Sequence, residues 1–340
     1  MTNDQPPSNA PPGGVPTLTV IAHELGISRS TVSRAFTRPQ VLRPETVARV
    51  LDVADRMGYA PNHIARALST GRNGNIALLV PDIANPFFPP LIRAAQARAD
   101  EQNYCVLLGD SAERPAQESR LIARFMPQVD GFVLASSRLP SSVLIEQAKR
   151  RPIVLVNRDI AGIPRVLIDS RAGIEQAVDH LHNLGHRRVA YVGGPATSWS
   201  DRQRRRAVTA AAAAHRMRLA LFRARPATYE GAEETVGGLL ASKVTAAIAF
   251  DDAVAHGLLA GMAAHGVRVP QGFSVIGCDD VLASTTYPPM TTIALRCAEA
   301  GARAVRLLLD VVAGSGGRNL RESLGSELVI RSTTAPPAHR

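Results

Sequence analysis

One repeated pattern constrains most of this 340-residue chain: short apolar runs alternate with stretches of helical spacing. A first series of runs occupies residues 76–80, 104–108, 131–135 and 153–157, and a second occupies residues 188–194, 219–224, 245–250 and 273–277. Runs this short, separated by helices, are typical of buried parallel sheets, because parallel strands need crossover connections. Two successive series predict two doubly wound α/β lobes. Since ligands bind beyond the carboxyl ends of parallel strands, we expect a cleft between the lobes.

The residues before the first run do not follow this pattern and are expected to form separate modules. The first sixteen, MTNDQPPSNAPPGGVP, lack a basic start and an apolar core and are expected to be a disordered tail rather than a signal peptide. Later, the Pro- and Thr-rich stretch 287–292 is expected to return the chain to the first lobe, where residues 297–312 form a helix. The predicted domains are the tail (1–16), an all-α helical domain (17–60), a hinge helix and linker (61–74) and a core (75–340), with lobe 1 at about 75–158 and 292–320 and lobe 2 at about 159–291 and 321–335.

Residues 18–36, LTVIAHELGISRSTVSRAF, predict two short helices joined by a tight turn, which is helix-turn-helix geometry. Gly26 stands where the turn needs a positive φ, and Thr19 and Ser28 can cap the two helices. Pro44 begins a third helix, and Gly58 ends it. The apolar residues expected to pack these helices together are Val20, Ile21, Leu25, Ile27, Val32, Ala35, Phe36, Val47, Val50, Leu51, Ala54 and Met57.

The second helix of this module presents hydroxyls and guanidinium groups that suit double-stranded DNA. Arginine can bind the O6 and N7 atoms of guanine bidentately, and short hydroxyls can contact phosphates. The alternative is a solvated helix face. The net charge of +10 adds little to the argument, because only two basic residues are lysines and the arginine bias accompanies an Ala-, Gly- and Pro-rich composition. The predicted DNA-contacting residues of this helix are Ser28, Arg29, Ser30, Thr31, Ser33 and Arg34.

A single short helix, residues 63–69, is expected between this module and the core. Asn62 can cap it, and Thr70-Gly71 ends it. A helix of this length is unstable alone, so it should need DNA or a partner chain to form. Leu68 is the informative residue, because it is apolar on a polar helix and has no evident core to join.

From Leu18 to Pro337 the chain resembles the LacI/GalR family, which includes the lactose, galactose and purine repressors. The matching segments, in the family's order, are LTVIAHELGISRSTVSRAF, GYAPNHIARAL, VPDIANPFF, HLHNLGHRRVAYVGGP, AFDDAVAHGLL, VIGCDD, PPMTTI and LVIRSTTAP. The resemblance implies a dimeric transcriptional regulator, a repressor, whose periplasmic-binding-protein-like core senses a small molecule and adjusts its affinity for a near-palindromic operator.

The resemblance also assigns roles within the DNA-binding residues. Arg29 and Ser30 stand at the family's most variable base contacts and Arg34 at a further one, while the other hydroxyls serve as caps and phosphate contacts. Paired hinge helices are implied to enter the minor groove and to insert Leu68 between base steps; packing of Leu68 on its own module is the alternative. The hinge residues expected to contact DNA are Asn62, His63, Ala65, Arg66 and Leu68. One departure from the family is Arg43, which stands where relatives commonly have a capping serine.

Polar residues that follow the predicted strands face the expected cleft and form a candidate effector site. Carboxylates, amides and one guanidinium can satisfy the hydroxyls of a sugar, and aromatic rings can cover its apolar face. Trp199 is equally consistent with a pocket wall or with a loop packed on the surface. The family often has asparagine at the position of Asp251. The predicted effector-binding residues, several of them implied by the resemblance, are Asp82, Asn85, Phe87, Asn157, Trp199, Arg204, Asp251 and Asp279.

The effector class and the direction of the response stay open at this point. A sugar acid favours additional arginines in the cleft, whereas a neutral sugar needs only Arg204 and the carboxylates. A ligand that prefers the open lobes induces, and one that prefers the DNA-competent arrangement corepresses. A homodimer is expected, and the tail after Arg331 lacks the heptads of a tetramerising coiled coil.

Other functional classes find little support in the sequence. The three cysteines are scattered and lack zinc or disulfide spacing, which favours a cytoplasmic location, and no apolar run is long enough for a transmembrane helix. Neighbouring aspartates at strand ends usually point apart, so no metal site, no catalytic residue and no cofactor is expected. The alternatives are a solute-binding receptor, which should have a secretion signal and no DNA-reading module, and a sugar-modifying enzyme, which needs an activated nucleophile or base.

Overall fold

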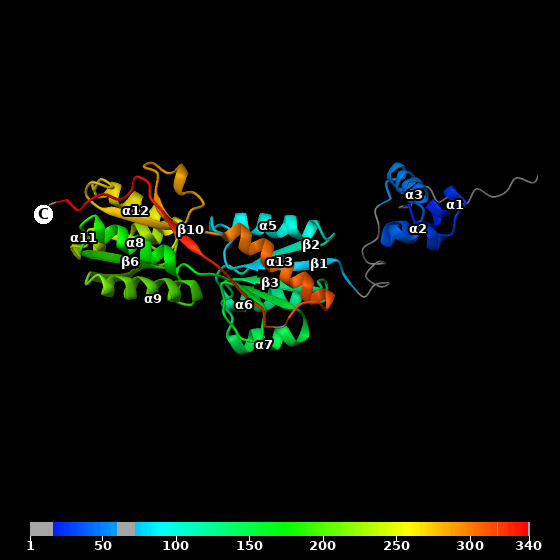
Figure 1. Ribbon diagram of the computed structural model, residues 1–340, viewed down its shortest axis with the longest axis horizontal. Helices are drawn as coiled ribbons and strands as arrows, with labels where there is room; N and C mark the ends of the chain where they lie inside the picture. The colour runs from blue at the N-terminus through cyan, green and yellow to red at the C-terminus, as the bar shows by residue number, and fades with distance from the viewer. Residues whose placement is uncertain (1–15, 60–71, 318, 339–340) are drawn as a thin grey trace, which may run out of the picture. The chain divides into compact units, whose positions relative to one another are not determined.

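The computed structural model describes residues 16–59, 72–317 and 319–338, and the chain divides into two units, Met1–Asn73 and Gly74–Arg340 (Figure 1). The expected N-terminal tail, up to residue 15, and most of the expected hinge, residues 61–71, lie outside the described residues.

The first unit is a bundle of short helices: α1 (Leu18–Leu25), α2 (Arg29–Thr37), a 3-10 turn η1 (Pro39–Val41) and α3 (Pro44–Arg56). Gly26 adopts φ 62°, as the turn between α1 and α2 requires, and the Ser28 side chain accepts a hydrogen bond from the Thr31 backbone N–H, which caps α2. Thr17, not Thr19, occupies the N-cap of α1, and its side chain makes no capping hydrogen bond. Arg43 likewise precedes α3 without a side-chain cap.

The core of this unit is made by fully buried Ile21, Val32 and Val50 with their neighbours. The prediction was wrong for Val20 and Leu51, which are 48% and 46% exposed. Each directly precedes or follows a buried residue, and one step along a helix turns a side chain by about 100°, away from the packed stripe. The packed stripe leaves Arg29, Ser30 and Arg34 of α2 exposed to solvent.

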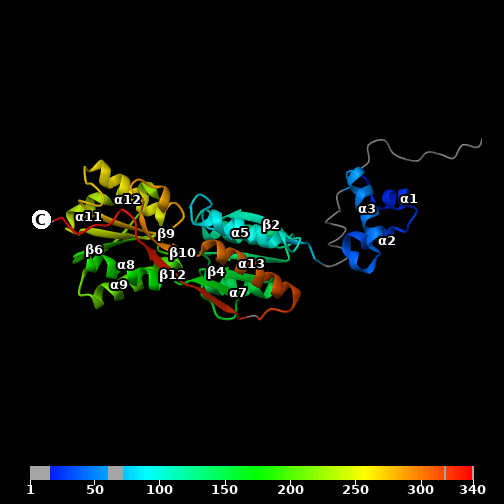
Figure 2. The same cartoon turned by 45° about the horizontal axis from the view of Figure 1, so that its top comes forward.

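The second unit contains two six-stranded sheets with helices on both faces (Figures 1 and 2). The first sheet has the order β11-β5-β4-β3-β1-β2, with β1 (Asn75–Val80), β2 (Cys105–Asp110), β3 (Gly131–Ala135), β4 (Ile153–Val156), β5 (Arg165–Ile168) and β11 (Arg321–Leu324). The second has the order β12-β10-β9-β8-β6-β7, with β6 (Arg188–Gly193), β7 (Arg218–Arg223), β8 (Ala246–Ala249), β9 (Ser274–Asp279), β10 (Thr291–Leu295) and β12 (Ser326–Val329). We call the two halves lobe 1 and lobe 2.

Alternate strand residues point to opposite faces, and each face is covered by helices. In lobe 1, α5 (Phe88–Asp100) and α13 (Cys297–Ala313) lie side by side on one face of the sheet, and α6 (Pro115–Phe125) and α7 (Ser141–Arg150) cover the other (Figures 1 and 2). In lobe 2, α8 (Arg171–Asn183) and α9 (Trp199–Ala214) cover one face, and α10 (Tyr229–Glu233), α11 (Val236–Ala241) and α12 (Asp252–Ala264) cover the other. The parallel, two-sided layering agrees with the predicted doubly wound lobes.

The lobe boundaries differ from the prediction. Strand β5 pairs with β4 and belongs to lobe 1, β10 pairs with β9 in lobe 2, and β11 pairs with β5 in lobe 1. The chain was expected to change lobe at 158/159, 291/292 and 320/321. It changes lobe later in each case, in the connections after β5, β10 and β11. The reason is that one more hydrogen-bonded strand precedes each crossing than the apolar runs of the sequence indicate. The chain crosses between the lobes at these three connections. Strand β12 is antiparallel to β10, with Ile293 opposite Leu328.

None of the helices in the described part of the chain combines the length and the apolar character needed to cross a bilayer. Its three cysteines are free thiols, with Cys105 exposed and Cys278 and Cys297 buried.

Candidate effector pocket and DNA-reading helix

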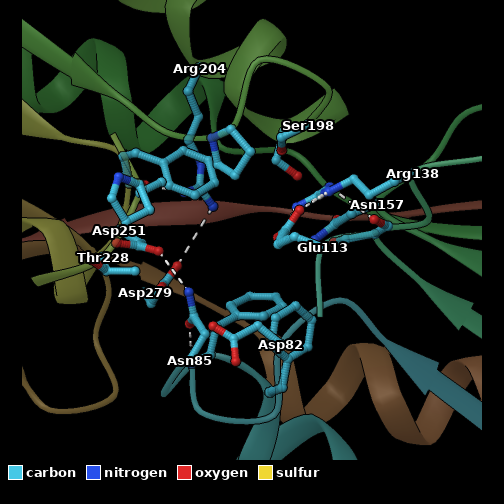
Figure 3. A pocket seen from close by; sticks show the side chains of 18 residues that line it. Asp82, Asn85, Glu113, Arg138, Asn157, Ser198, Arg204, Thr228, Asp251 and Asp279 are labelled. Atoms are coloured by element: carbon cyan, nitrogen blue, oxygen red, sulfur yellow. Dashed lines mark hydrogen bonds and ion pairs between the residues drawn. The ribbon is translucent and has the colours of Figure 1, made fainter. Parts of the chain in front are cut away.

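A pocket opens between the two lobes at the carboxyl ends of the strands, with about 670 Å³ of empty space that includes solvent at its mouth (Figure 3). This size suits a small molecule. Its lining comes from loops after nearly every parallel strand. Lobe 1 contributes Asp82, Asn85, Phe87, Phe88, Glu113, Ser136, Arg138 and Asn157, and lobe 2 contributes Pro195, Ser198, Ser200, Arg204, Pro226, Ala227, Thr228, Phe250, Asp251 and Asp279.

Seven of the eight predicted effector-binding residues lie in this lining: Asp82, Asn85, Phe87, Asn157, Arg204, Asp251 and Asp279. Trp199 does not. It begins α9 and lines a separate groove with Gln203 and Arg206. Residues four and seven positions apart share one face of a helix, so Trp199, Gln203 and Arg206 lie together. Ser200 and Arg204, also four positions apart, lie on the face that meets the pocket. Both alternatives for Trp199 were thus wrong: it is a groove wall outside the pocket.

Arg204 forms the cationic centre of the lobe 2 side of the pocket. Its guanidinium donates to the carbonyl oxygen of Phe250, lies 4.8 Å from the centroid of the Phe250 ring and lies 3.6 Å from Asp279 Oδ1. Both charged side chains are nearly inaccessible, at 6% and 3% exposure. A side chain at Gly194 would come within 2.4 Å of the Phe250 ring, so glycine is needed there for the ring to stack. Arg204 is the sole arginine of its basic run that lines the pocket.

Burial disfavours the charged form of each ionisable group in this site, which lowers the pKa of an arginine and raises the pKa of a carboxyl group. Burial disfavours charge on Arg204, but the Cys278 thiol and the nearby carboxylates outweigh it and raise the pKa of the guanidinium further. Burial raises the pKa of Asp279 well above its ordinary value, and Arg204 offsets this only in part. Among the described residues, Arg204 Nε and Asp279 Oδ1 are buried without a hydrogen-bond partner. Buried polar atoms are normally satisfied, so these two atoms are exceptions in the wall of the pocket.

The two carboxylate oxygens of Asp251 accept hydrogen bonds from different parts of the core. Its Oδ1 accepts a 2.8 Å hydrogen bond from the Val254 backbone N–H and caps α12, while its Oδ2 accepts a 2.8 Å hydrogen bond from Asn85 Nδ2 in lobe 1. Asn85 Oδ1 in turn accepts from the Phe87 backbone N–H at 2.9 Å, which fixes the orientation of the amide. Burial raises the pKa of Asp251, and the hydrogen bonds from Val254 and Asn85 counteract this.

The neighbouring aspartates of the predicted pairs point elsewhere, as expected. Asp252 accepts hydrogen bonds from the Thr292 hydroxyl and the Val281 backbone N–H, and Asp280 pairs with Arg331 at 2.7 Å. No group of three or more His, Cys, Asp or Glu residues in the described ranges is placed to hold a metal ion.

Sequence reasoning missed the polar residues that follow β2 and β3. Glu113 and Arg138 form a bidentate ion pair with N–O distances of 2.5 and 2.6 Å, and Ser136 lies beside them in the pocket lining. The available signal was position: they follow strands in the same way as Asp82 and Asn157 do. Arg158, in contrast, turns away and donates to the Leu139 carbonyl oxygen.

Helix α2 and its N-cap carry the hydroxyls and guanidinium groups of the predicted DNA-contacting set. Ser28 Oγ lies 2.8 Å from the hydroxyls of both Ser30 and Thr31, and Arg29 and Arg34 are exposed. Ser33 is half-buried. The predicted hinge contacts, Asn62, His63, Ala65, Arg66 and Leu68, lie outside the described residues.

Comparisons with known proteins agree along the chain. Residues 17–62 match the model of bacterial regulatory proteins of the lacI family, and residues 178–334 match that of a periplasmic binding protein-like domain. The HTH-type transcriptional repressor CytR of Escherichia coli (strain K12) is 32% identical over 332 residues, covering 94% of this chain and 96% of that protein.

Two solved structures share the fold. The lac repressor dimer bound to operator and the anti-inducer ONPF is 23% identical, covers 95% of this chain and 100% of that one, and has a TM-score of 0.84. A LacI family transcriptional regulator from Enterococcus faecium with bound ribose is 28% identical, covers 77% of this chain and 99% of that one, and has a TM-score of 0.71.

Proposed function

The chain belongs to the LacI family of bacterial regulatory proteins, and from this premise we propose that it is a transcriptional repressor that binds a near-palindromic operator as a homodimer. A small effector held between the lobes sets its affinity for that operator. The observation that carries the proposal is one chain with both a helix-turn-helix and a pocket to which two lobes contribute polar side chains.

The helix-turn-helix supplies the DNA contacts. Arg29, Ser30 and Arg34 read base edges in the major groove, and Ser28, Thr31 and Ser33 cap the helix or contact phosphates. The hinge residues Asn62, His63, Ala65 and Arg66 follow the minor groove, and Leu68 wedges between base steps. A regulator bound to bacterial DNA acts in the cytoplasm.

The charges of the pocket favour a neutral sugar over a sugar acid, the two classes left open by the sequence. Four carboxylates line it, on Asp82, Glu113, Asp251 and Asp279, against only two guanidiniums. Arg138 already donates two hydrogen bonds to the Glu113 carboxylate, so Arg204 is the one guanidinium of the lining left to donate to a ligand acceptor. Phe87, Phe88 and Phe250 supply apolar walls for the carbon face of a sugar ring.

Coupling between effector and operator runs through the orientation of the lobes. Asp251 Oδ2 is shared between Asn85 of lobe 1 and any ligand hydroxyl that enters the pocket, because Oδ1 is committed to the helix cap. A ligand that replaces Asn85 weakens this contact between the lobes, and the three chain crossings transmit the change to lobe 1, from which the linker leaves. Such a ligand acts as an inducer.

The non-enzymatic character is part of the proposal. The pocket is lined by neither histidine nor cysteine. A nucleophile activated by an imidazole, or a thiolate nucleophile, is therefore missing from the lining.

Two measurements on the purified protein test the proposal. Selection from random duplex DNA should enrich a near-palindrome with two half-sites. Thermal unfolding in the presence of neutral sugars, sugar acids, amino sugars and nucleosides should show a rise of a few degrees with a neutral sugar at a hundredfold its Kd, which corresponds to about 2.7 kcal/mol. Enrichment of no DNA sequence would overturn the repressor function, whereas an exclusive response to sugar acids would overturn the effector class.

A further inference from the structure

We propose that Glu113 is a specificity-determining residue of the pocket: Arg138 positions its carboxylate to accept a hydrogen bond from the effector at the lobe 1 end, where it excludes ligands that carry a negative charge. This inference rests on the proposed function, because it takes the pocket to be the effector site.

Arg138 holds Glu113 in one orientation. Its Nε donates to Glu113 Oε2 at 2.5 Å and its Nη2 to Oε1 at 2.6 Å, while Nη1 donates to the Ser136 carbonyl oxygen at 2.9 Å. The Arg138 backbone N–H also donates to Glu118 Oε2 at 3.0 Å, which ties the arginine to α6. A planar guanidinium engaged this way cannot rotate toward an incoming anion. Arg138 is therefore a positioning residue.

The carboxylate of Glu113 keeps acceptor capacity for a ligand. Each carboxylate oxygen can accept two hydrogen bonds, and Arg138 supplies one to each. The Arg138 side chain is 5% exposed, whereas that of Glu113 is 37% exposed and lines the pocket. The arginine thus forms the buried support, and the carboxylate is the accessible part of the pair.

The backbone around Glu113 adopts a conformation that residues with a Cβ disfavour. Ala112 and Glu113 both lie in the left-handed region, with φ values of 48° and 57°. Three hydrogen bonds hold this turn, from the Ala112 N–H to Asp110 Oδ1, from the Glu113 N–H to the Pro81 carbonyl and from the Arg114 N–H to the Ser111 carbonyl. Such strain tends to collect at functional sites.

The same backbone feature recurs around the pocket. Ser136, Asn157 and Asp279, which follow or end β3, β4 and β9, also have positive φ and also belong to the lining. Glu113, at φ 57°, therefore shares its left-handed φ with Asn157, at φ 53°, which is predicted to bind effector, whereas Asp279 has a larger positive φ of 137°. Since glycine would adopt these angles without strain, the retained side chains point to a role for the side chains themselves.

The position of Glu113 defines what the effector must offer. In Figure 3, Glu113 and Arg138 lie with Asn157 and Ser198 at one end of the pocket, and Asp251 and Asp279 lie at the other. Acceptor carboxylates thus stand at both ends, one set on each lobe. A ligand that spans them needs hydrogen-bond donors at both ends, which hydroxyl or ammonium groups supply and a carboxylate or phosphate does not.

Isothermal titration of the full-length chain with matched monosaccharides tests this. The probes are neutral hexoses and pentoses, the corresponding uronic acids and the amino sugars, applied to the wild type, to Glu113→Gln and to Glu322→Gln. Glu322 is a matched control, because it also pairs with arginines in lobe 1, Arg303 and Arg306, but lies outside the pocket lining. Glu113→Asp is the second variant. It keeps the negative charge, but its side chain is one methylene shorter and moves the carboxylate oxygens away from the ligand.

We expect the wild type to bind a neutral or amino sugar and to reject its acid. Glu113→Gln should bind that sugar about tenfold more weakly, which is the usual effect of losing one charge-assisted hydrogen bond. The ratio of its affinities for the sugar and for the corresponding acid should fall by at least as much. Glu113→Asp should lose affinity and keep the discrimination, and Glu322→Gln should change neither.

Unchanged selectivity in Glu113→Gln, with binding abolished in Asp279→Asn, would overturn the role of Glu113 and leave the proposed function standing. If the glutamine variant does not fold, unaltered affinity in Glu113→Asp overturns the inference by itself. Absence of binding to every probe by the folded wild type would overturn both the effector class and this inference.

Discussion

The side chains of Asn85 and Asp251 join lobe 1 to lobe 2 by a single 2.8 Å hydrogen bond, from Asn85 Nδ2 to Asp251 Oδ2. The donor is fixed by the Phe87 backbone N–H and the acceptor by the cap of α12, so neither group can turn aside without losing a second bond. A ligand that competes for this oxygen acts directly on the contact between the lobes.

Replacing Asn85 with Asp removes the donor and places a second carboxylate against Asp251. We expect the lobes to separate and the free energy of unfolding of the core to fall by about 1–3 kcal/mol, the usual result of leaving a buried acceptor unpaired. Small-angle scattering should report a larger radius of gyration. Asn103→Asp, in the exposed turn that follows α5, is the control, and identical scattering curves for the two variants would contradict the assignment.

Arg34→Ala should weaken operator binding by about 1–3 kcal/mol and relax the preference at one base pair of each half-site, because a bidentate arginine reads guanine. The measurement is a titration against the selected operator and its single-base variants. Arg56→Ala serves as control, since Arg56 lies on α3 beside Asp52 at 3.3 Å. A uniform loss across all base variants would reassign Arg34 to a phosphate contact.

Leu68→Ala should reduce operator affinity and leave the unfolding of the core unchanged, since the proposed wedge acts on base stacking and not on packing within the lobes. Gel-shift titration gives the first quantity and calorimetry the second. Equal affinity of variant and wild type would remove Leu68 from the DNA contacts.

Acidification should loosen the C-terminal segment from lobe 2. His186 is buried between the Thr245 hydroxyl, 2.7 Å from Nδ1, and the Ala335 carbonyl oxygen, 2.9 Å from Nε2, and burial lowers its pKa. Burial also lowers the pKa of His180, whose Nε2 lies 2.9 Å from the hydroxyl of Thr334. The folded state favours neutral imidazoles, so their contribution to stability is complete above pH of about 6.5 and is lost as the pH falls through the folded pKa values.

The unfolding temperature of the core should therefore drop between pH 7.5 and pH 5. His186→Gln should start lower and fall less over that range, while His265→Gln, on an exposed site after α12, should keep the wild-type slope. Equal slopes for all three proteins would rule out His186 as a source of the pH dependence.

The strands that were predictable are those with continuous burial. All five residues of β3 are buried, so its apolar run stood out in the sequence, whereas β11 (RESL) and β12 (SELV) are edge strands with polar residues. Strand β5 begins with the buried Arg165, whose guanidinium pairs with Asp159 and donates to Asn319 and to the Ile163 carbonyl oxygen. Pairing partners distant in sequence decide these strands, and no local pattern contains that information.

The residues of the candidate site also fall into those that the sequence predicts and those that it does not. Asp82, Asn157 and Asp279 were predictable from their place at strand ends, because topology alone brings such ends together. Glu113 and Arg138 offered the same positional signal, but their ion pair across 25 residues of chain and the left-handed backbone at Glu113 have no local sequence pattern. Trp199 was misplaced because a shift of one residue along α9 changes the face that it occupies.

Helix α9 carries both the tryptophan of the chain and Arg204. It begins at Trp199, outside the pocket, and presents Arg204 to the pocket little more than one turn later. Because this is the only tryptophan among 340 residues, the ultraviolet emission of the native chain comes mainly from the helix that holds the central cation of the site. The protein thus carries its own optical label on this helix, and a change in emission on adding a ligand would report a rearrangement around Trp199 without an attached dye or a mutation.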